Sequence, residues 1–414
     1  MDLSNNSSSA ATKKVAMTRG LVLLFAFCCG AIVANIYYAQ PIISLIAPDI
    51  GMSSGSASLI VSLTQIGYAI GLFFLVPLAD LVENRRLMIM TLVITILSLI
   101  AAGLAEQPSV FLIVAVLIGF SSVSVQMLVP LAAHLASEET RGRVVGGIMG
   151  GLLLGILLAR PLSSLITDHF GWRTVFLGAA ALMVMISIVV ALTIPKWQPT
   201  HRASYGQLLM SLGQLIRHEP VLRQRALYQG LMFAAFSLFW TAVPLALSGE
   251  FGLTQSQIAI FSLVGAIGAI AAPLSGRLAD AGHTRRASQL AMMLGIVSFL
   301  PAFIRPVYGV IGLAVTGVAL DFAVQMNMVL GQRAVYALAA NSRGRLNALY
   351  VTSIFIGGAV GSSVASPLYE YGKWIAVAVV GSALSLTALM IFWVVSHRAK
   401  QNLMTKTITA KHCH

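Results

Sequence analysis

Two ionisable residues lie deep inside apolar stretches of the chain, where charge is costly. Asp321 is the one acidic residue of thirteen that lies far from the ends of such a stretch, and Arg160 is the one similarly embedded base. An embedded charge costs at least ~2.5–3.5 kcal/mol on membrane-insertion scales, so each is a functional candidate. A carboxylate held away from water is harder to ionise. The sequence therefore predicts that Asp321 exchanges protons and pairs with Arg160 in one state; a purely structural ion pair is the alternative.

A second group of charges occurs twice. Residues 77–86 read PLADLVENRR and residues 277–286 read RLADAGHTRR, each at the end of a long apolar run. A repeat of this spacing in an apolar chain indicates two similar membrane-embedded halves. A carboxylate at a helix end can pair in one conformation and separate in another, although the arginines could serve only to set topology. The candidate conformational switch comprises Asp80, Arg85, Arg86, Asp280, Arg285 and Arg286.

Residue types needed for other chemistry are not grouped along the chain. Cys28 and Cys29 are adjacent, Cys413 is near the end, and the eight histidines are scattered, which predicts neither a disulfide framework nor a metal site. The phosphate-binding pattern Gly-x-x-x-x-Gly-Lys-Ser/Thr is absent, so direct use of ATP is not expected. We expect no catalytic residues and no cofactor.

Long helices must position these residues. The chain is 58% apolar and only 9% charged, against about 25% charged in soluble domains. A membrane-spanning helix needs about 20 mainly apolar residues, and apolar runs of this length satisfy their backbone as helices rather than strands. We predict twelve spans at about residues 19–43, 55–77, 86–105, 109–135, 144–167, 173–195, 226–247, 255–276, 287–304, 307–337, 346–368 and 374–396.

The formal net charge of +13 follows the topology of these spans. With the N-terminus inside the cell, all but four of the 26 Lys and Arg residues fall in cytoplasmic segments or at their edges. The exceptions are Arg160, Arg173, Arg305 and Lys373. This is the bias that orients membrane proteins, so the charge does not indicate a nucleic-acid partner. We expect a multi-pass protein of the inner (plasma) membrane with both termini in the cytoplasm.

The division of the chain follows from the spans and from one long polar stretch between the sixth and seventh. We predict a cytoplasmic tail, a six-helix bundle, a cytoplasmic linker, a second six-helix bundle and a second tail at residues 1–18, 19–195, 196–224, 225–396 and 397–414. Within the linker, Leu208, Leu212, Leu215 and Ile216 recur at helical spacing, which indicates a short helix on the membrane surface.

The repeated loops resemble the signature loop of the major facilitator superfamily, Gly-x-Leu-Ala-Asp-Arg-x-Gly-Arg-Arg. The matching residues are Leu78, Ala79, Asp80 and Arg85 in the first copy and Gly276, Leu278, Ala279, Asp280 and Arg285 in the second. Neither copy has Arg directly after Asp. The resemblance implies an all-α membrane protein with twelve transmembrane helices in two pseudo-symmetric six-helix bundles.

The fifth span adds a looser resemblance to the drug:proton antiporters of that superfamily. Glycines at 146, 147, 150, 151 and 155 precede Arg160 and Pro161, as in the helix-5 motif of that branch. Gly-x-x-x-Gly pairs allow close helix packing, so gating and ordinary packing are equally open. The branch usually carries an Arg in helix 4, where this chain has Ala115.

The resemblance further implies that helices 1, 4, 7 and 10 line a central cavity. The predicted substrate-binding residues are Asn35, Tyr38, Gln126, Gln229, Phe233, Phe236, Trp240 and Gln325. The aromatic residues of this group could instead serve in packing or at the membrane interface, and the Asn and Gln residues could instead form hydrogen bonds between helices.

Together these features predict a secondary active transporter that acts as a monomer, not an enzyme. The expected function is proton-coupled efflux of small, partly apolar organic molecules or drugs by alternating access. The partners would be a small-molecule substrate, protons and the lipid bilayer, with no nucleic acid. A sugar or metabolite transporter of the same fold is the nearest alternative. The sequence lacks the rings of ligands that a channel would need and the clustered His, Glu or Cys residues that a membrane enzyme would need.

Overall fold

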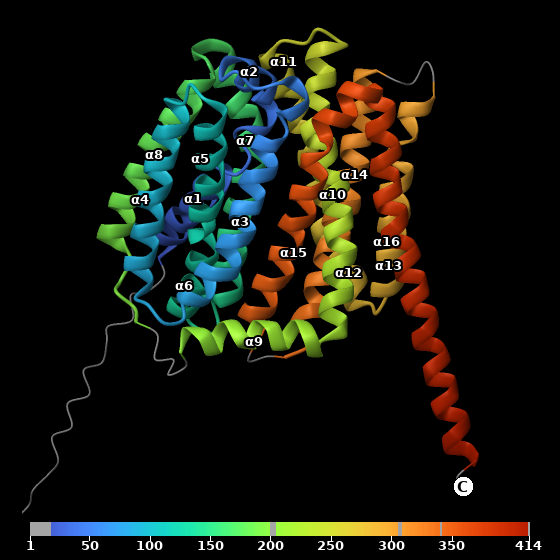
Figure 1. Cartoon of the computed structure of the whole chain (residues 1–414). Helices are drawn as coiled ribbons and strands as arrows, with labels where there is room; N and C mark the ends of the chain where they lie inside the picture. The colour runs from blue at the N-terminus through green and yellow to red at the C-terminus, as the bar shows by residue number, and fades with distance from the viewer. Residues whose placement is uncertain (1–17, 199–203, 305–308, 340–341, 413–414) are drawn as a thin grey trace, which may run out of the picture.

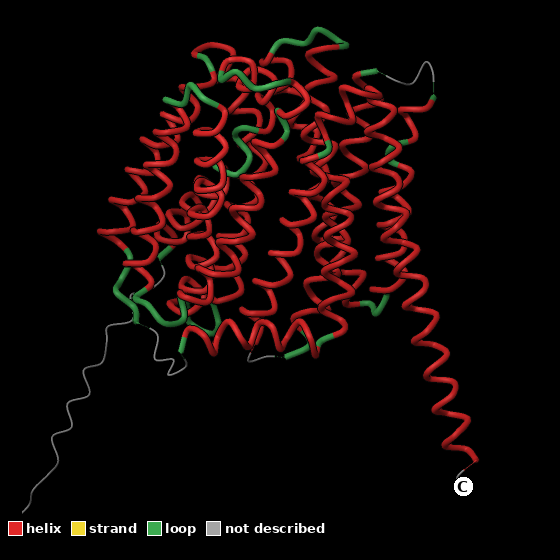
Figure 2. Tube along the Cα trace, viewed as in Figure 1, coloured by secondary structure: helices red, strands yellow, loops and turns green. Residues whose placement is uncertain are grey.

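The protein is a bundle of long helices. The computed structural model describes residues 18–198, 204–304, 309–339 and 342–412, and no strand occurs within these ranges (Figure 2). In this part of the chain, eleven helical segments are long and apolar enough to cross a membrane, and a twelfth, Arg19–Ala34, is apolar but shorter. The predicted all-α membrane fold with twelve helices is confirmed.

The helices of the first half are frequently interrupted by short 3₁₀ turns. In order they are α1 (Arg19–Ala34), η1 (Gln40–Ile42), α2 (Ile43–Asp49), η2 (Ser54–Ser56), α3 (Leu59–Leu78), α4 (Asn84–Gly103), α5 (Pro108–Ser121), η3 (Ser122–Ser124), α6 (Val125–Leu135), α7 (Arg141–Phe170) and α8 (Trp172–Thr193).

The second half follows a short connecting helix. Its elements are α9 (Tyr205–His218), α10 (Pro220–Gly249), α11 (Gln255–Ser262), η4 (Leu263–Ile270), α12 (Ala271–Asp280), α13 (Thr284–Val297), η5 (Leu300–Phe303), α14 (Val310–Tyr336), α15 (Arg343–Ser363) and α16 (Ala365–His412). The span predicted at 255–276 therefore contains an eight-residue 3₁₀ segment, η4.

The first predicted span, 19–43, is shorter in the structure. Helix α1 ends at Ala34, and the chain turns before η1 begins at Gln40. Pro41 lies at the start of η1 and lacks the amide hydrogen that a continuous helix would need. The break matters because it changes the direction of every side chain after Asn35.

Helix α9 joins the two halves. It begins with a capping box at Ser204 and buries Leu208 and Leu212, as the linker leucines predict. The Tyr205 hydroxyl donates to the carbonyl of Phe74 in α3 at 2.9 Å. In Figure 1, α9 lies across the lower end of the molecule, and α2 and α11 lie at the upper end. We call the α9 end the linker end and the opposite end the far end.

Each half has its own buried apolar core. One core is built from residues between Phe25 and Ile194 and is joined by Phe355 of the second half, and the other is built from residues between Leu212 and Phe392. The arrangement is that of two six-helix bundles, as predicted.

Within each bundle, glycines allow one pair of helices to pack backbone against backbone: α1 with α7 in the first bundle and α10 with α15 in the second. A Cβ at Gly155 of α7 would lie 2.2 Å from the Gly30 carbonyl oxygen of α1. A Cβ at Gly361 of α15 would lie 2.0 Å from the Ala234 carbonyl oxygen of α10. The close packing predicted for glycines of the fifth span is therefore observed at Gly155. It does not extend to Gly146, where a Cβ would meet nothing within 4 Å.

Hydrogen bonds close the two bundles against each other toward the far end. The Ser58 amide donates to the Ser366 hydroxyl at 3.1 Å, and the Ser62 hydroxyl donates to the carbonyl of Ala359 at 2.8 Å. Nearer the middle, the Gln65 amide donates to the Ser237 hydroxyl at 2.9 Å. These contacts join α3 and its N-cap Ser58 to α16, α15 and α10, so the far end is closed in this conformation.

Parts of the predicted tails and linker lie outside the described residues, namely 1–17, 199–203 and 413–414. Arg305 lies outside them as well. Helix α16 continues to His412, well beyond the predicted end of the last span at residue 396. Figure 1 shows this extension reaching past the linker end of the other helices.

Candidate functional site

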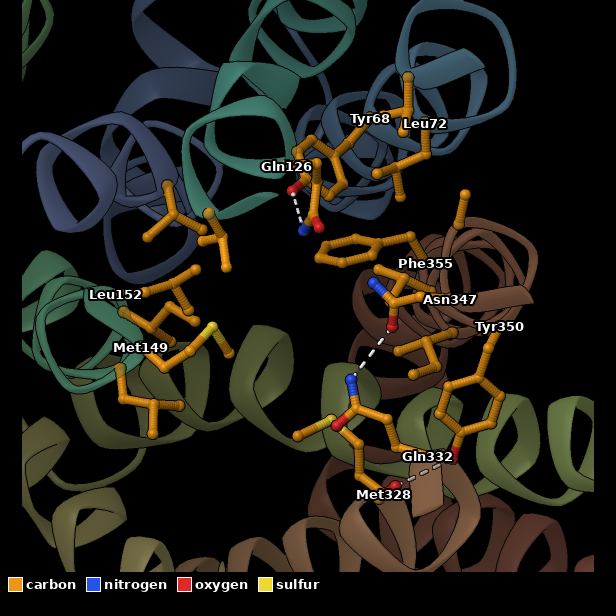
Figure 3. Close-up of a pocket in the computed structure, with 18 of the residues that line it drawn as sticks. Tyr68, Leu72, Gln126, Met149, Leu152, Met328, Gln332, Asn347, Tyr350 and Phe355 are labelled. Carbon is orange, nitrogen blue, oxygen red and sulfur yellow. Dashed lines mark hydrogen bonds between the residues drawn. The ribbon is translucent and has the colours of Figure 1, made fainter. Parts of the chain in front are cut away.

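A cavity of about 890 Å³ lies between the bundles and reaches the linker end. Helices α3, α6 and α7 line one side, and α10, η4, α14 and α15 line the other. In Figure 3, Met149 and Leu152 of α7 face Phe355 and Asn347 of α15 across open space. The volume lies within the range of about 300–1,000 Å³ that is typical of pockets for small organic ligands.

The cavity wall is mainly apolar, with a few amide and hydroxyl groups held in fixed pairs. The Gln126 amide donates to the Tyr68 hydroxyl at 3.3 Å (Figure 3). The Gln332 amide donates to Asn347 Oδ1 at 3.0 Å. Such pairs leave acceptor and donor positions directed at a ligand, which is how an apolar pocket gains specificity.

Arg160 lies at the closed inner part of the cavity and is only 4% exposed. Its Nε donates to Gln40 Oε1 at 2.7 Å. Its guanidinium carbon lies 4.6 Å from the centre of the Trp240 ring and 5.1 Å from that of Tyr37. A guanidinium within about 6 Å of an aromatic ring face is attracted by the ring. Among the described residues, Arg160 Nη2 has no hydrogen-bond partner.

Asp321 lies on the opposite wall, in α14, and is partly exposed to the cavity. Its Oδ1 accepts a hydrogen bond from the indole nitrogen of Trp240 at 2.7 Å. Two glycines of η4 allow the approach, because a Cβ at Gly265 would lie 2.6 Å from Asp321 Oδ2 and one at Gly268 would lie 2.5 Å from Asp321 Cβ.

Trp240 connects the embedded acid and base. Its ring face carries the Arg160 guanidinium, and its N–H binds Asp321. The direct ion pair expected from the sequence is not formed in this conformation, since the ion pairs within 4.0 Å among the described residues are Arg173–Asp49 and Arg333–Asp280. Each group instead contacts Trp240, Arg160 at the face of the indole ring and Asp321 at the ring N–H.

Four of the residues predicted to bind substrate line the cavity. They are Gln126, Phe233, Phe236 and Gln325. Trp240 is 1% exposed and lies behind this surface, against Arg160 and Asp321.

Three other predicted residues do not line the cavity in this conformation. Asn35 is buried in the first bundle, where its amide donates to the Ile32 carbonyl at 3.1 Å. Tyr38 is buried, and its neighbour Tyr37 faces the cavity instead, because α1 ends before this point and helical spacing no longer applies. Gln229 is fully buried and donates to the Val324 carbonyl at 3.2 Å, so it connects α10 to α14.

The repeated Asp and Arg residues lie at the linker end. Asp80 follows α3 and lines the mouth of the cavity. Asp280 pairs with Arg333 of α14 within the same bundle. Arg85 Nη1 donates to the Ile194 carbonyl at 3.4 Å, and Arg86, Arg285 and Arg286 are exposed.

Residues that sequence reasoning missed hold Arg160 and Asp321 in place. Gln40 binds Arg160 and also donates to the Thr241 hydroxyl of the other bundle at 3.1 Å. Its position beside Pro41, directly after the first apolar run, was the available signal. Gly265 and Gly268 had no signal beyond being small residues in an apolar span.

The described residues contain no group of three or more His, Cys, Asp or Glu side chains placed to hold a metal ion. The inner part of the cavity carries one guanidinium, that of Arg160, and one carboxylate, that of Asp321.

Comparison with known proteins agrees with this architecture. The family model of the Major Facilitator Superfamily matches residues 22–304 and 225–410 in two overlapping stretches. "Uncharacterized transporter YgaY" of Escherichia coli O157:H7 is 37% identical over 383 residues, covering 92% of this chain and 97% of the relative.

A second relative, "Probable transporter SCO4007" of Streptomyces coelicolor, is 32% identical over 371 residues, covering 89% of this chain and 86% of the relative. The crystal structure of the nucleoside transporter NupG superimposes with a TM-score of 0.70 at 14% identity, covering 90% of this chain and 97% of that chain. At that identity the likeness concerns the fold. On the family match and the close relatives, the chain belongs to the major facilitator superfamily of membrane transporters.

Proposed function

We propose that this transporter exports small, partly apolar organic molecules from the cytoplasm in exchange for protons, by alternating access. The observation that carries the proposal is the cavity between the bundles, which reaches one end of the molecule and contains a partly exposed, embedded carboxylate at Asp321. A binding site that is open at one end and closed at the other is what a carrier requires in each half of its cycle.

The distribution of Lys and Arg supports an orientation with the linker end in the cytoplasm. The conformation described here is then inward-facing, both termini are cytoplasmic, and the protein lies in the inner membrane. Reopening toward the outside requires the hydrogen bonds of Ser58, Ser62 and Gln65 across the bundle interface to break. These are bonds between uncharged groups, each worth about 0.5–1.5 kcal/mol net, so the closure can be reversed.

The wall of the cavity supports a partly apolar substrate. The rings of Phe233 and Phe236 lie 5.0 Å apart and nearly parallel on one wall, and Phe355 lies 5.6 Å from Phe233. Aromatic surfaces of this kind bind apolar and aromatic groups through their large contact area. The amides of Gln126 and Gln332 add a small number of polar contacts.

The surroundings of Asp321 support the coupling to protons. The apolar span that holds it disfavours the ionised carboxylate, and the Trp240 N–H favours it. A carboxylate under these opposing influences can take up and release a proton as water enters or leaves the cavity. Access from one side at a time would then convert a proton gradient into substrate movement.

A pH-gradient experiment with Asp321→Asn tests this function. Purified protein in proteoliposomes should accumulate substrates from a panel of small aromatic compounds when only a pH difference is imposed. Asp321→Asn should abolish that accumulation and retain exchange without a gradient. Glu106→Gln, which changes an exposed carboxylate in the loop between α4 and α5, is the matched control. Accumulation by Asp321→Asn under a pH difference alone would refute the assignment of the proton site.

One feature supports a second candidate, a sugar or metabolite transporter. Gln126, Gln332 and Asn347 place amide groups around the cavity, and amides are suitable partners for hydroxyl groups. The same proteoliposomes challenged with radiolabelled hexoses would reveal this activity as saturable uptake.

A further inference from the structure

Arg160 carries a polar group that the protein itself does not satisfy. Its Nε donates a hydrogen bond to Gln40 Oε1. The guanidinium group also contacts the aromatic rings of Trp240, Tyr37 and Phe236. Within the described residues, Nη2 is buried and unpartnered, although Arg160 lines the cavity. Leaving a buried charged donor unpaired is unfavourable, so a ligand acceptor that reaches this atom would gain a charge-assisted hydrogen bond.

The charges of the cavity indicate the sign of that ligand. Among the described lining residues, Arg160, Arg343 and Arg345 are positive, and Asp80 and Asp321 are negative. The two arginines of α15 lie at the mouth, where they would attract anions from the linker end. Asp321 forms no ion pair with Arg160 within 4.0 Å among the described residues, and its Oδ1 is instead bound by the Trp240 N–H. A cationic substrate at Asp321 would have to lie beside the Arg160 guanidinium.

The shape of the site indicates which anion fits. The planar fork of a guanidinium matches the two oxygens of a carboxylate. The surrounding surface is aromatic, from Tyr37, Phe236 and Phe233. A single guanidinium in an apolar wall balances one negative charge, and a dianion would leave one charge removed from water without a partner.

We propose that Arg160 binds the carboxylate of the substrate, and that this transporter acts on organic monocarboxylates with an apolar or aromatic body. The proposal rests on the proposed function, since it assigns the substrate class of the same cavity. It has a consequence for energetics: an exported monoanion exchanged for one proton moves two charges per cycle, so a membrane potential that is negative inside adds to the driving force.

A matched series of ligands tests the proposal by direct binding. The probes are 3-phenylpropionate, its neutral amide and 3-phenylpropylamine, together with straight-chain carboxylates of six to twelve carbons. Binding to the full-length protein in nanodiscs is followed by calorimetry and by tryptophan fluorescence. The acid should bind at least about ten-fold more tightly than the amide, as expected for a charge-assisted hydrogen bond in place of a neutral one, and the amine should bind least.

Variants locate the effect at Arg160. Arg160→Gln should remove the preference for the acid, so that acid and amide bind with similar affinity. Arg160→Lys, which keeps the charge without the planar fork, should retain part of the preference. Arg173→Gln, which removes an arginine paired with Asp49 outside the cavity, should change nothing. If Arg160→Gln does not fold, the proposal is still tested by the order of ligand affinities in the wild-type protein and by the preference for the acid that Arg160→Lys retains.

The outcomes separate this inference from the proposed function. Equal binding of acid and amide, a preference for the amine, or no binding by any acid of the series would overturn the proposal. Acid binding without transport driven by a pH difference would leave the carboxylate site standing and refute proton-coupled export. Proton-driven transport of neutral or cationic compounds with no preference for acids would support proton-coupled export and refute the carboxylate site.

Discussion

At the scale of single residues, the unusual side chain is Trp240, because it contacts both embedded charges at once. Its ring faces the Arg160 guanidinium at 4.6 Å, and its N–H binds Asp321 at 2.7 Å. Protonation of Asp321 would remove the negative charge that this N–H binds. The hydrogen bond would then weaken, because one to a charged group is worth about 1.5–3 kcal/mol and one to a neutral group about half of that. On the proposed proton coupling, we expect the indole to move more easily when the proton arrives, together with Arg160.

Trp240→Phe separates these two contacts. Phenylalanine keeps a ring beneath Arg160 and loses the hydrogen bond to Asp321. We expect accumulation driven by a pH difference to fall by about ten-fold, the equivalent of ~1.4 kcal/mol, with exchange in the absence of a gradient retained. Trp374→Phe, at another buried tryptophan of the second bundle, serves as control for packing loss. An equal effect of both variants would argue that Trp240 only fills space.

At the scale of elements, helical spacing predicted the long regular helices well and failed where a helix is broken. On α10 the spacing correctly brought Phe233 and Phe236 to the cavity wall. It also selected Gln229, whose amide instead finds a carbonyl of α14, because a fully buried polar group must be paired. Tyr38 was selected in place of Tyr37 because α1 ends at Ala34, and helical spacing does not apply across the turn that follows.

Close packing between elements gives a sharper prediction. Gly155→Ala places a Cβ about where the Gly30 backbone lies, and backbone cannot move as a flexible side chain would. We expect a loss of stability of about 1–3 kcal/mol, the usual cost of overpacking, measured as a lower thermal unfolding temperature and a lower yield of folded protein.

Gly146→Ala is the matched control for that substitution. It lies on the same helix, α7, and its Cβ would meet nothing within 4 Å. Since alanine is a better helix former than glycine by up to about 1 kcal/mol, stability should be unchanged or higher. Equal destabilisation by the two substitutions would contradict the assigned helix contact.

At the scale of the whole molecule, the two bundles meet at the far end and are separated by the cavity toward the linker end. The closed end uses serine and glutamine contacts between α3 and the second bundle. The mouth of the cavity carries Asp80 on one bundle and Arg343 and Arg345 on the other. We propose that these charges of opposite sign approach each other when the mouth closes, in contrast to the uncharged contacts of the far end.

Asp80→Asn should therefore favour the inward-facing conformation. Removing the charge weakens closure of the mouth without touching the far end. In protein lacking Cys28, Cys29 and Cys413, a cysteine placed at Ser62 reports opening of the far end by its reaction with a thiol reagent. We expect several-fold slower labelling in Asp80→Asn and unchanged ligand affinity. Glu83→Gln in the same loop is the control, and unchanged labelling in Asp80→Asn would remove this carboxylate from the switch.

The eight 3₁₀ residues of η4 have a geometric consequence for the helix that follows them. A 3₁₀-helix has 3.0 residues per turn and rises about 2.0 Å per residue, against 3.6 residues and about 1.5 Å for an α-helix. Rewinding all eight residues as α-helix would draw α12 about 4 Å toward α11 and rotate it by about 160°. Within this segment Gly265 and Gly268 lie against Asp321, and beyond its C-terminal end Asp280 pairs with Arg333. The pitch of η4 thus sets both the height and the rotation of the linker-end loop relative to the carboxylate in the middle of the membrane.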